Sequence, residues 1–234
     1  MNLRDAKILI TGGSSGIGFE TARTLIEAGA QVAITGRDEA KLQAAAEKLK
    51  AHGIRADVSD AADVQRMVDE TVRVFGSMNV LINNAGIGSF APLVALDLAE
   101  FRRVMDTNVF GAMLAGQAAA RQFIAQGKGG SLINIASTAA QRGFANGTAY
   151  TASKFALAAM TECWRAELRT HGIRVMQLNP SEVVTEFQAR MGHQQVVNET
   201  KLRAREIAHA IKAMLEMDDR GFVTELTVWA TNPK

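Results

Sequence analysis

The chain has 234 residues, of which 47% are hydrophobic and 21% charged, and this composition excludes a disordered protein. Its formal net charge is only +2, with basic residues scattered among acidic ones, so nucleic acid is not an expected partner. Cys163 is the only cysteine, which excludes an internal disulfide framework and fits a cytoplasmic location. No apolar run is long enough to span a bilayer and no cleavable signal pattern is present, so we expect no membrane association.

Patterns typical of buried strands alternate with patterns typical of amphipathic helices along the chain. The first strand is followed by glycines and then by a helix with Ile17, Ala22 and Leu25 on one face. Asp38 and Asp60 are suitable N-caps for the next two helices. The predicted strands are residues 7–10, 31–35, 54–56, 80–82, 131–136, 173–178 and 222–228, and the predicted helices are residues 16–28, 38–51, 60–75, 98–125, 150–170 and 205–217.

This alternation predicts an α/β fold of the doubly wound type, with about seven parallel strands in the order 3-2-1-4-5-6-7. Right-handed crossovers place the connecting helices on both faces of such a sheet. No repeat, low-complexity tract or Pro/Gly-rich linker divides the chain, so residues 1–234 are predicted to form a single domain.

The connection between the first strand and the first helix, residues 11–18, is rich in glycine. In a Rossmann-like fold such glycines allow a tight turn and a close approach of the backbone to a pyrophosphate at the helix N-terminus. The spacing differs from G-x-G-x-x-G and lacks the lysine of a P-loop, so an ordinary strand-to-helix turn is the alternative. The strand before and the helix after favour cofactor binding. The expected contacts are Gly12, Ser14, Ser15, Gly16, Ile17 and Gly18.

Tyr150 and Lys154 lie four residues apart on a predicted helix and therefore project from the same face. A phenol with its ordinary pKa of about 10 is a poor acid or base at neutral pH, and a nearby ammonium group lowers that pKa. The same spacing also arises by chance on helical surfaces. Two facts favour a catalytic pair: Tyr150 is the only tyrosine, and Ser137 follows the fifth predicted strand, at the sheet edge where ligands bind.

Four segments, in this order, resemble the short-chain dehydrogenase/reductase (SDR) family in its compact single-domain form: residues 11–18, residues 83–86, Ser137 and the pair Tyr150–Lys154. Asn108 adds a fifth match. Each match is weak alone, but together they are specific, and the resemblance covers essentially the whole chain. It implies an NAD(P)-dependent oxidoreductase, in a Rossmann-type dinucleotide-binding and catalytic domain, that transfers a hydride between nicotinamide and a carbonyl or alcohol.

The resemblance also implies a role for each matched residue. Tyr150 would exchange a proton with the substrate oxygen, and Lys154 would lower the pKa of Tyr150 and hold the cofactor ribose. Ser137 would hydrogen-bond the substrate oxygen, and Asn108 would hold a water molecule in a proton relay. The loop Asn84-Ala85-Gly86 would form the floor beneath the nicotinamide ribose, although Asn83 and Asn84 also suit an ordinary turn.

The end of the second predicted strand bears on the choice of cofactor. NAD-preferring relatives carry an acidic residue there, whereas this chain has Gly36 followed by Arg37. Arg37 could bind a 2′-phosphate through two hydrogen bonds, which favours NADP(H) and leaves NAD(H) as the second candidate. A solvated loop arginine is the alternative. Asp57-Val58 matches the adenine-binding position of the family, and Asp57 could equally cap a helix.

The chain departs from the family after the sixth predicted strand, where Ser181 follows Pro180 in place of the usual glycine. This puts the local backbone path in doubt, while Pro180, Val183 and Thr185 still match positions that meet the carboxamide and phosphates. Residues 186–203 resemble the substrate lid of the family. The basic residues Arg190, His193, Lys201, Arg203 and Arg205 could attract an anionic substrate such as an acyl thioester of a carrier, but a solvated basic surface is the favoured interpretation.

Two other functions compete with an oxidoreductase. A non-catalytic NADP(H)-binding sensor or scaffold would typically lack one of the four residues Asn108, Ser137, Tyr150 and Lys154, and none is missing. Isomerases, epimerases and dehydratases on this scaffold carry a further substrate domain, for which the chain has no room. The candidate carbonyl or alcohol substrates are a ketone, a 3-oxoacyl compound, a sugar or a steroid-like molecule.

Predictions about the oligomeric state and about bound metal rest on weaker features of the sequence. Small residues from Gly111 to Ala119 resemble the helix through which relatives form a homodimer or homotetramer, although a monomer could use them for close internal packing. The histidines lack the spacing of metal ligands, so no metal is expected.

Overall fold

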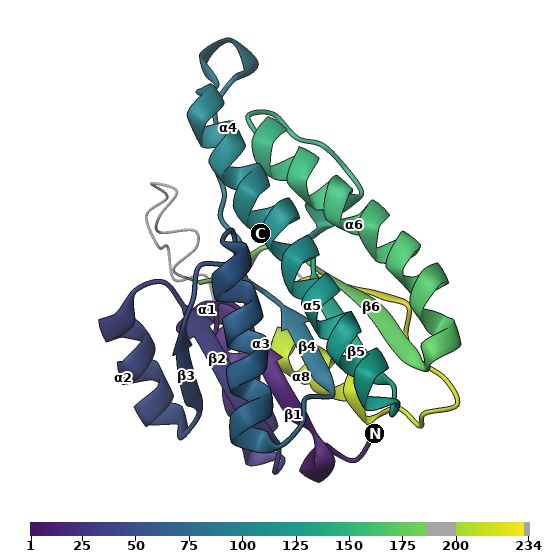
Figure 1. Ribbon diagram of the computed structural model, residues 1–234. Helices are drawn as coiled ribbons and strands as arrows, with labels where there is room; N and C mark the ends of the chain where they lie inside the picture. Colours follow the sequence, from purple (N-terminus) through teal and green to yellow (C-terminus); the bar gives the residue numbers. More distant parts are fainter. Residues whose placement is uncertain (186–199, 232–234) are drawn as a thin grey trace.

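The computed structural model describes residues 1–185 and 200–231. Seven of the strands in this part of the chain form one sheet in the order β3-β2-β1-β4-β5-β6-β9, and every pairing within it is parallel (Figure 1). The strands are β1 (Lys7–Ile10), β2 (Gln31–Gly36), β3 (His52–Arg55), β4 (Val80–Asn83), β5 (Gly130–Ile135), β6 (Ile173–Pro180), β7 (Val183–Val184), β8 (Leu202–Arg203) and β9 (Glu225–Val228). The helices are α1 (Gly16–Glu27), α2 (Glu39–Leu49), α3 (Ala61–Phe75), α4 (Leu98–Met105), α5 (Gly111–Gln126), α6 (Thr148–Leu168) and α8 (Ala204–Glu216).

The strand order confirms the doubly wound α/β topology expected from the sequence. Beyond Pro180 the structure contains two short strands that are not among the predicted ones. Val183–Val184 forms β7, which pairs with β8 in a separate two-stranded sheet. The seventh strand of the main sheet is therefore β9, which pairs with β6.

The helix expected over residues 98–125 is divided into three parts. α4 ends at Met105, the segment η3 (Asp106–Phe110) makes a π-helical turn, and α5 begins at Gly111. Such wide turns inside helices are frequent at functional sites. Because Asn108 lies within this turn, its side chain is displaced from the position that a continuous α-helix would give it.

The two predicted aspartate N-caps are confirmed. Asp38 Oδ1 accepts a 3.0 Å hydrogen bond from the backbone N–H of Lys41, at the start of α2. Asp60 Oδ1 accepts a 2.8 Å hydrogen bond from the backbone N–H of Asp63, at the start of α3. Each carboxylate satisfies a helix N–H that has no partner within the helix.

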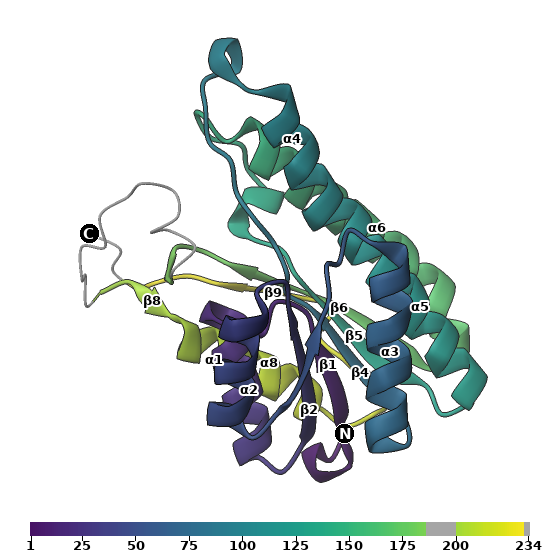
Figure 2. The same ribbon diagram turned by 60° about the vertical axis from the view of Figure 1, so that its left-hand side comes forward.

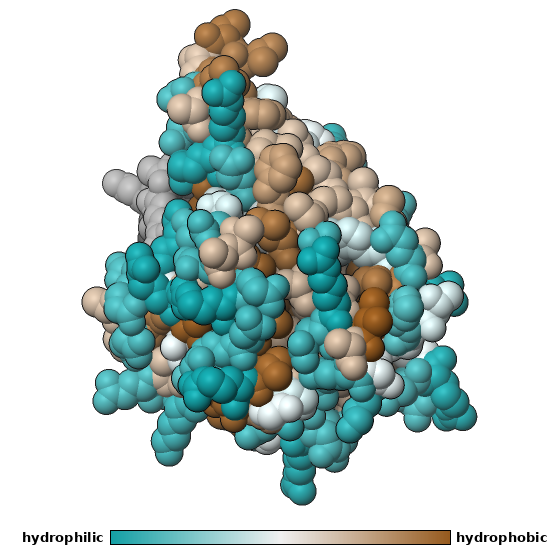
Figure 3. Space-filling view, in the orientation of Figure 1, coloured by the Kyte–Doolittle hydropathy of each residue, from teal (hydrophilic) through white to brown (hydrophobic). Residues whose placement is uncertain are grey.

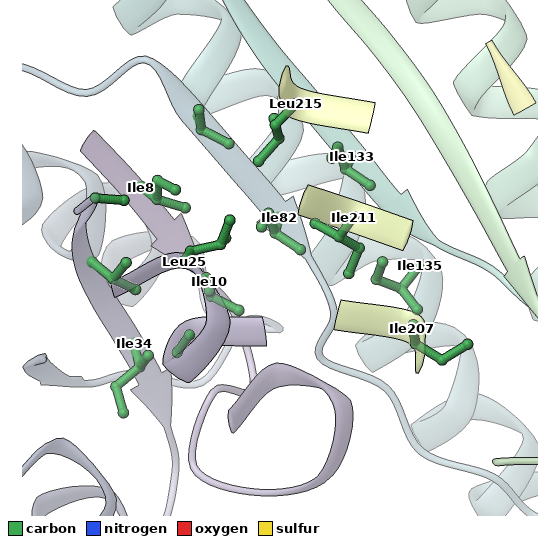
Figure 4. Close-up of a cluster of buried hydrophobic side chains, with 14 of the residues drawn as sticks. Ile8, Ile10, Leu25, Ile34, Ile82, Ile133, Ile135, Ile207, Ile211 and Leu215 are labelled. Atoms are coloured by element: carbon green, nitrogen blue, oxygen red, sulfur yellow. The ribbon is translucent and has the colours of Figure 1, made fainter. Parts of the chain in front are cut away.

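Two hydrophobic clusters hold the helices against opposite faces of the sheet. Successive side chains of a strand point to opposite faces, so Ile8 and Ile10 of β1 enter one cluster and Leu9 enters the other. The first cluster also receives Leu25 from α1 and Ile211 from α8 (Figure 4). These five side chains are completely buried, and each contributes about 1.5–3 kcal/mol relative to an exposed position.

The parallel strands bring the loops that follow them to one edge of the sheet, which is where ligands bind in this class of fold. α4 projects beyond the sheet in both views (Figure 1 and Figure 2). Apolar side chains gather at the outer tip of this projection, where Leu93 and Val94 are 77% and 97% exposed (Figure 3). Among the described helices, none combines the length and the apolar character needed to cross a membrane.

Candidate active site

A cavity of about 1720 Å³ lies between the loops that follow β1 to β6. Gly18 and Asn108, two of the residues expected in the site, do not line it, because both are buried behind its wall. The structure thus brings the remaining expected residues together around one space. They are Gly12, Ser14, Ser15, Gly16, Ile17, Arg37, Asp57, Val58, Asn84, Ala85, Gly86, Ser137, Tyr150, Lys154, Pro180, Val183 and Thr185.

The glycine loop packs tightly against the loop after β4. Gly12 has a φ of +66°, and a Cβ there would lie 2.9 Å from the Cα of Ala85. A Cβ on Gly18 would lie 2.4 Å from the backbone oxygen of Gly12 and 2.5 Å from Asn84 Nδ2. Gly18 therefore does not contact a ligand. Its missing side chain allows α1 to pack closely against the glycine loop.

Thr11 and Asn84 join the two loops by hydrogen bonds. Thr11 Oγ1 accepts bonds of 3.0 Å from the backbone N–H groups of Asn84 and Ala85. Asn84 Nδ2 donates to the backbone oxygens of Thr11 and Gly12 at 2.9 and 3.0 Å. Asn84 is thus more than a turn residue, since its side chain fixes the floor of the cavity. Thr11 was not among the expected site residues. Its position directly after β1, at the edge where ligands bind, was the feature of the sequence that could have indicated its role.

Tyr150 and Lys154 lie on the same side of α6, as their spacing predicts. Lys154 Nζ is 5.6 Å from the centroid of the Tyr150 ring and donates a 2.9 Å hydrogen bond to the backbone oxygen of Ile135. The Ser137 side chain hydrogen-bonds that of Tyr150. Ser137 Oγ also accepts a 3.1 Å bond from the backbone N–H of Ala139, which holds the serine at the end of β5. The expected hydroxyl pair is therefore assembled.

The pKa of Tyr150 shifts in the direction opposite to that expected from the sequence. Burial raises the pKa of Tyr150, and the hydrogen bond with Ser137 offsets part of that rise. Burial also lowers the pKa of Lys154 to about 8, because the ammonium group is removed from water. The sequence argument considered only the charge of Lys154, whereas the depth of both side chains in the protein decides the sign.

The side chain of Asn108 connects η3 with the cavity floor and with α6. Its Oδ1 accepts a 2.8 Å hydrogen bond from the backbone N–H of Ile87, and its Nδ2 donates to the backbone oxygen of Ile87 at 2.8 Å. Nδ2 also donates to Ser153 Oγ at 3.0 Å, and Ser153 Oγ donates to the backbone oxygen of Tyr150 at 2.7 Å. Asn108 thus positions the loop after β4 relative to α6, the helix that carries Tyr150.

Arg37 and Asp57 face each other across the loops after β2 and β3. Arg37 Nη1 lies 3.8 Å from Asp57 Oδ2, and both side chains are partly exposed to the cavity. Asp57 Oδ1 accepts hydrogen bonds from the backbone N–H and the hydroxyl of Ser59, at 3.0 and 2.7 Å. The helix-capping interpretation of Asp57 is wrong, because Asp60 is the N-cap of α3 and Asp57 closes the turn before it.

Ser181, which replaces the usual glycine, does not interrupt the backbone pairing of the main sheet. The N–H of Ser181 donates a 2.9 Å bond to the backbone oxygen of Val228, which continues the pairing of β6 with β9. A Cβ on Gly16 would lie 3.5 Å from Thr185, so this segment reaches the glycine loop. Of the expected lid, residues 186–199, with Arg190 and His193, lie outside the described residues.

Three of the basic residues near the expected lid are described. Lys201 pairs with Glu182 at 2.5 Å, and Arg205 pairs with Glu206 at 2.6 Å. Arg203 is exposed and lies in β8. These pairings favour a solvated, charge-balanced surface over an anion-binding site. The sequence analysis also favoured a solvated surface. No cluster of three or more His, Cys, Asp or Glu side chains suited to a metal ion occurs within residues 1–185 and 200–231.

The sequence did not single out some residues that line the cavity. Lys41 and Asp38, at the start of α2, line it together with Arg37. Phe90 and Phe144 line it beside Tyr150, and Trp229 lines it after β9. Single aromatic residues in loops have no periodic pattern, so only the folded arrangement shows that they converge.

Comparisons with known proteins agree with this site. Residues 6–196 match the family model for short chain dehydrogenases. An uncharacterised oxidoreductase of Bacillus subtilis is 33% identical over 192 residues, which are 79% of this chain but only 54% of that protein, so the match spans about half of the relative. Two solved structures are similar: 3-ketoacyl-(acyl-carrier-protein) reductase of Brucella melitensis complexed with NADH, and an alcohol dehydrogenase of the archaeon Thermococcus sibiricus complexed with 5-hydroxy-NADP.

The similarity to both structures extends over nearly the whole chain. The Brucella reductase has a TM-score of 0.88 and 28% identity, with 96% of each chain covered. The archaeal alcohol dehydrogenase has a TM-score of 0.88 and 26% identity, with 98% of this chain and 100% of that chain covered. The chain belongs to the short-chain dehydrogenase family, and its relatives support nicotinamide-dependent oxidoreduction as the class of chemistry.

Proposed function

We propose that this chain is a carbonyl/alcohol oxidoreductase that prefers NADP(H) to NAD(H), with Tyr150 as the general acid or base. The observation that carries the proposal is the hydrogen bond between the side chains of Tyr150 and Ser137, in the wall of the cavity that the glycine loop also lines. Two hydroxyl groups joined in this way can both contact one substrate oxygen. Family membership and the nicotinamide-bound neighbours support the same reaction class.

The residues around the cavity suit a dinucleotide. Ser15, the N-cap of α1, makes no side-chain capping bond, so the first N–H groups of that helix suit a pyrophosphate. The Asn84–Gly86 loop and Lys154 suit the nicotinamide ribose, since a Cβ on Gly86 would lie 3.7 Å from Lys154 Nζ. Val58 suits the adenine, and the segment from Pro180 through Val183 to Thr185 suits the carboxamide and phosphates. When bound, the nicotinamide supplies or accepts the hydride.

In carbonyl reduction, the substrate oxygen must gain a proton as the carbon gains a hydride. The raised pKa of Tyr150 keeps its hydroxyl protonated at neutral pH, ready to donate that proton. Ser137 stabilises the negative charge that develops on the same oxygen. Lys154, with a pKa of about 8, remains mostly charged at pH 7 and stabilises the phenolate that Tyr150 becomes. In alcohol oxidation Tyr150 must first lose its proton.

Asn108 acts as a positioning residue in this scheme. Its amide holds the backbone of Ile87 and, through Ser153, the backbone of Tyr150. The family resemblance adds a water molecule held by Asn108 in a relay from Lys154. A Cβ on Gly86 would lie 3.4 Å from Asn108 Oδ1 and 3.7 Å from Lys154 Nζ, which supports a relay passing near this point.

The preference for NADP(H) rests on the charges after β2. Gly36 supplies no carboxylate, and Arg37 and Lys41 line the cavity with cations, while the carboxylate of Asp38 between them caps α2 through the N–H of Lys41. The Arg37–Asp57 contact of 3.8 Å is long and partly exposed, so a 2′-phosphate can compete for the guanidinium. Assays with NADPH and NADH over a panel of ketones, aldehydes and alcohols test both parts of the proposal. Tight NADPH binding without turnover of any of them would favour the non-catalytic sensor or scaffold.

We further propose that residues 1–234 act as one cytoplasmic domain and that the protein assembles as a homodimer or homotetramer. The small residues of α5 do not carry this proposal, because a Cβ on Gly116 would lie 3.0 Å from the Trp164 ring and Ala115 and Ala119 are buried within the subunit. Support comes instead from exposed apolar side chains such as Leu93 and Val94 at the tip near α4 (Figure 3). Light scattering coupled to size exclusion tests the assembly.

A further inference from the structure

Two phenylalanines extend the ring surface of Tyr150 within the cavity. Phe90 lies in the loop after β4, and Phe144 lies between β5 and α6. The centroid of the Phe90 ring is 5.6 Å from that of Tyr150 and 6.0 Å from that of Phe144, distances typical of favourable aromatic pairs. We call Phe90 and Phe144 the aromatic wall. It begins at Tyr150, the general acid or base of the proposed function.

The backbone around the aromatic wall holds its two loops together. The N–H of Ala91 donates a 3.0 Å hydrogen bond to the backbone oxygen of Asn146, so the loops that carry Phe90 and Phe144 are joined directly. The ring of Phe144 lies against Gly147, where a Cβ would be only 2.7 Å from two of its ring carbons. Phe144 thus rests on the start of α6, yet 51% of it remains exposed.

Of the polar side chains near the wall, Gln141 and Glu182 have partners elsewhere, and Arg142, two residues before Phe144, also lines the cavity. Gln141 lines this part of the cavity, but its Nε2 donates to Glu225 at 2.8 Å and to Thr227 at 3.3 Å. Glu182 pairs with Lys201. Among the described residues, a substrate placed beside Tyr150 therefore meets the Ser137 and Tyr150 hydroxyls at its oxygen and the ring faces of Phe90 and Phe144 along its body. A polyol in this place would leave hydroxyl groups without partners against the rings, which disfavours its binding.

We propose that the aromatic wall selects apolar ring ketones, and the corresponding secondary ring alcohols, as substrates. This inference rests on the proposed function, because it concerns the substrate class of the same site. A saturated or aromatic ring can lie against Phe90 and Phe144 while its carbonyl oxygen reaches Tyr150 and Ser137.

The test compares cyclohexanone with dihydroxyacetone as substrates of the full-length enzyme with saturating NADPH. We expect kcat/KM to favour cyclohexanone by about tenfold or more in the wild type. Phe144→Ala should lower kcat/KM for cyclohexanone by about fivefold or more, mainly through KM, because that ring contacts the substrate and not the reacting atoms. Turnover of dihydroxyacetone and binding of NADPH, followed by nicotinamide fluorescence, should change by less than about twofold.

Phe155→Ala is the matched control. It removes the same group from a ring of similar exposure, 46%, which does not line the cavity, and it should leave both substrates unaffected. If the wild type uses the two ketones equally, or if Phe144→Ala lowers kcat/KM equally for both, the aromatic wall does not select the substrate. The proposed oxidoreductase function would be unaffected by that result. Failure to reduce any carbonyl despite NADPH binding overturns the proposed function itself, and this inference with it.

Discussion

Lys154 Nζ donates a 2.9 Å hydrogen bond to the backbone oxygen of Ile135, which ties α6 to the last residue of β5. Ser137 follows two residues later, so the bond fixes the register between the serine and Tyr150, which lies one helical turn before Lys154. The same bond holds the ammonium group in a buried position, where its pKa falls to about 8. One contact thus sets both the geometry and the electrostatics of the site.

Tyr150→Phe should reduce kcat by a factor of about 10² to 10⁴, because the substrate oxygen loses its proton donor. The glycine loop and Lys154, which suit the pyrophosphate and the ribose, are unchanged, so NADPH affinity should change little. Steady-state kinetics and a fluorescence titration of NADPH measure the two effects separately. Retention of more than a tenth of the wild-type kcat would show that another group supplies the proton.

The phenol of Tyr150 should ionise above its ordinary pKa of 10 in the folded protein, because burial disfavours the phenolate. Ultraviolet absorbance of phenolate measures this directly, since the chain has one tyrosine. Ser137→Ala should raise the pKa further, because the Ser137 hydrogen bond lowers it. A midpoint below 10 in the folded wild type, or a lower one in the variant, contradicts this account.

The raised pKa also predicts opposite pH profiles for the two directions of the reaction. Carbonyl reduction needs both the protonated phenol and the charged Lys154, so its rate should fall between about pH 7 and pH 10, as Lys154 loses its proton near pH 8. Alcohol oxidation needs the phenolate and should increase over the same range. Initial rates with fixed saturating cofactor measure both profiles. A shared optimum near pH 7 would argue against Tyr150 as the titrating group.

Lys154 should make the folded protein more stable as the pH rises from 8 to 10.5. Its pKa is about 8 when folded and has the ordinary value of 10.5 when unfolded, so in this window the unfolded chain binds the extra proton. The free energy of unfolding should increase by about 3 kcal/mol across the window relative to Lys154→Met, which has no such group. Urea unfolding at several pH values measures the difference, and parallel curves for the two proteins would refute it.

Gly18→Ala should destabilise the protein by about 1–3 kcal/mol and weaken cofactor binding, because α1 must move away from the glycine loop. The added Cβ would lie 2.4 Å from the backbone oxygen of Gly12, which cannot yield as a side chain does. Gly221→Ala is the control, since nothing lies within 4 Å of its Cβ position, and it should change stability by less than about 0.5 kcal/mol. Thermal unfolding with and without NADPH tests both variants.

Arg37→Ala should raise the KM for NADPH about tenfold or more and leave that for NADH nearly unchanged, because only NADPH carries the 2′-phosphate. Gly36→Asp should reverse the preference toward NADH. The added Cβ would approach Ser14 Oγ to 3.1 Å, and that hydroxyl ends a side chain that can rotate away. An equal effect of Arg37→Ala on both cofactors would assign Arg37 a structural role only.

Local rules in the sequence were enough for the seven strands of the main sheet, most of the helices and much of the site, but not for β7, β8 or the π-helical turn. Apolar patterning located the strand at residues 7–10, and aspartate capping located the starts of α2 and α3. The positions of Tyr150, Lys154 and Ser137 followed from helical spacing and from the edge at which parallel strands end. Each of these depends on residues close together in the chain, or on a topology with few alternatives.

Only the tertiary structure decided how deeply groups are buried and which distant loops meet. The Ile87 backbone accepts and donates bonds with Asn108 because a π-helical turn redirects that side chain, and nothing in the local sequence specifies the turn. The sign of the Tyr150 pKa shift depends on the removal of water by the surrounding elements. Phe90 and Phe144 meet because their loops cross at one edge of the sheet, although 54 positions separate them in the chain. Sequence patterns report periodicity along the chain, whereas desolvation and contacts between loops arise only after the whole sheet has formed.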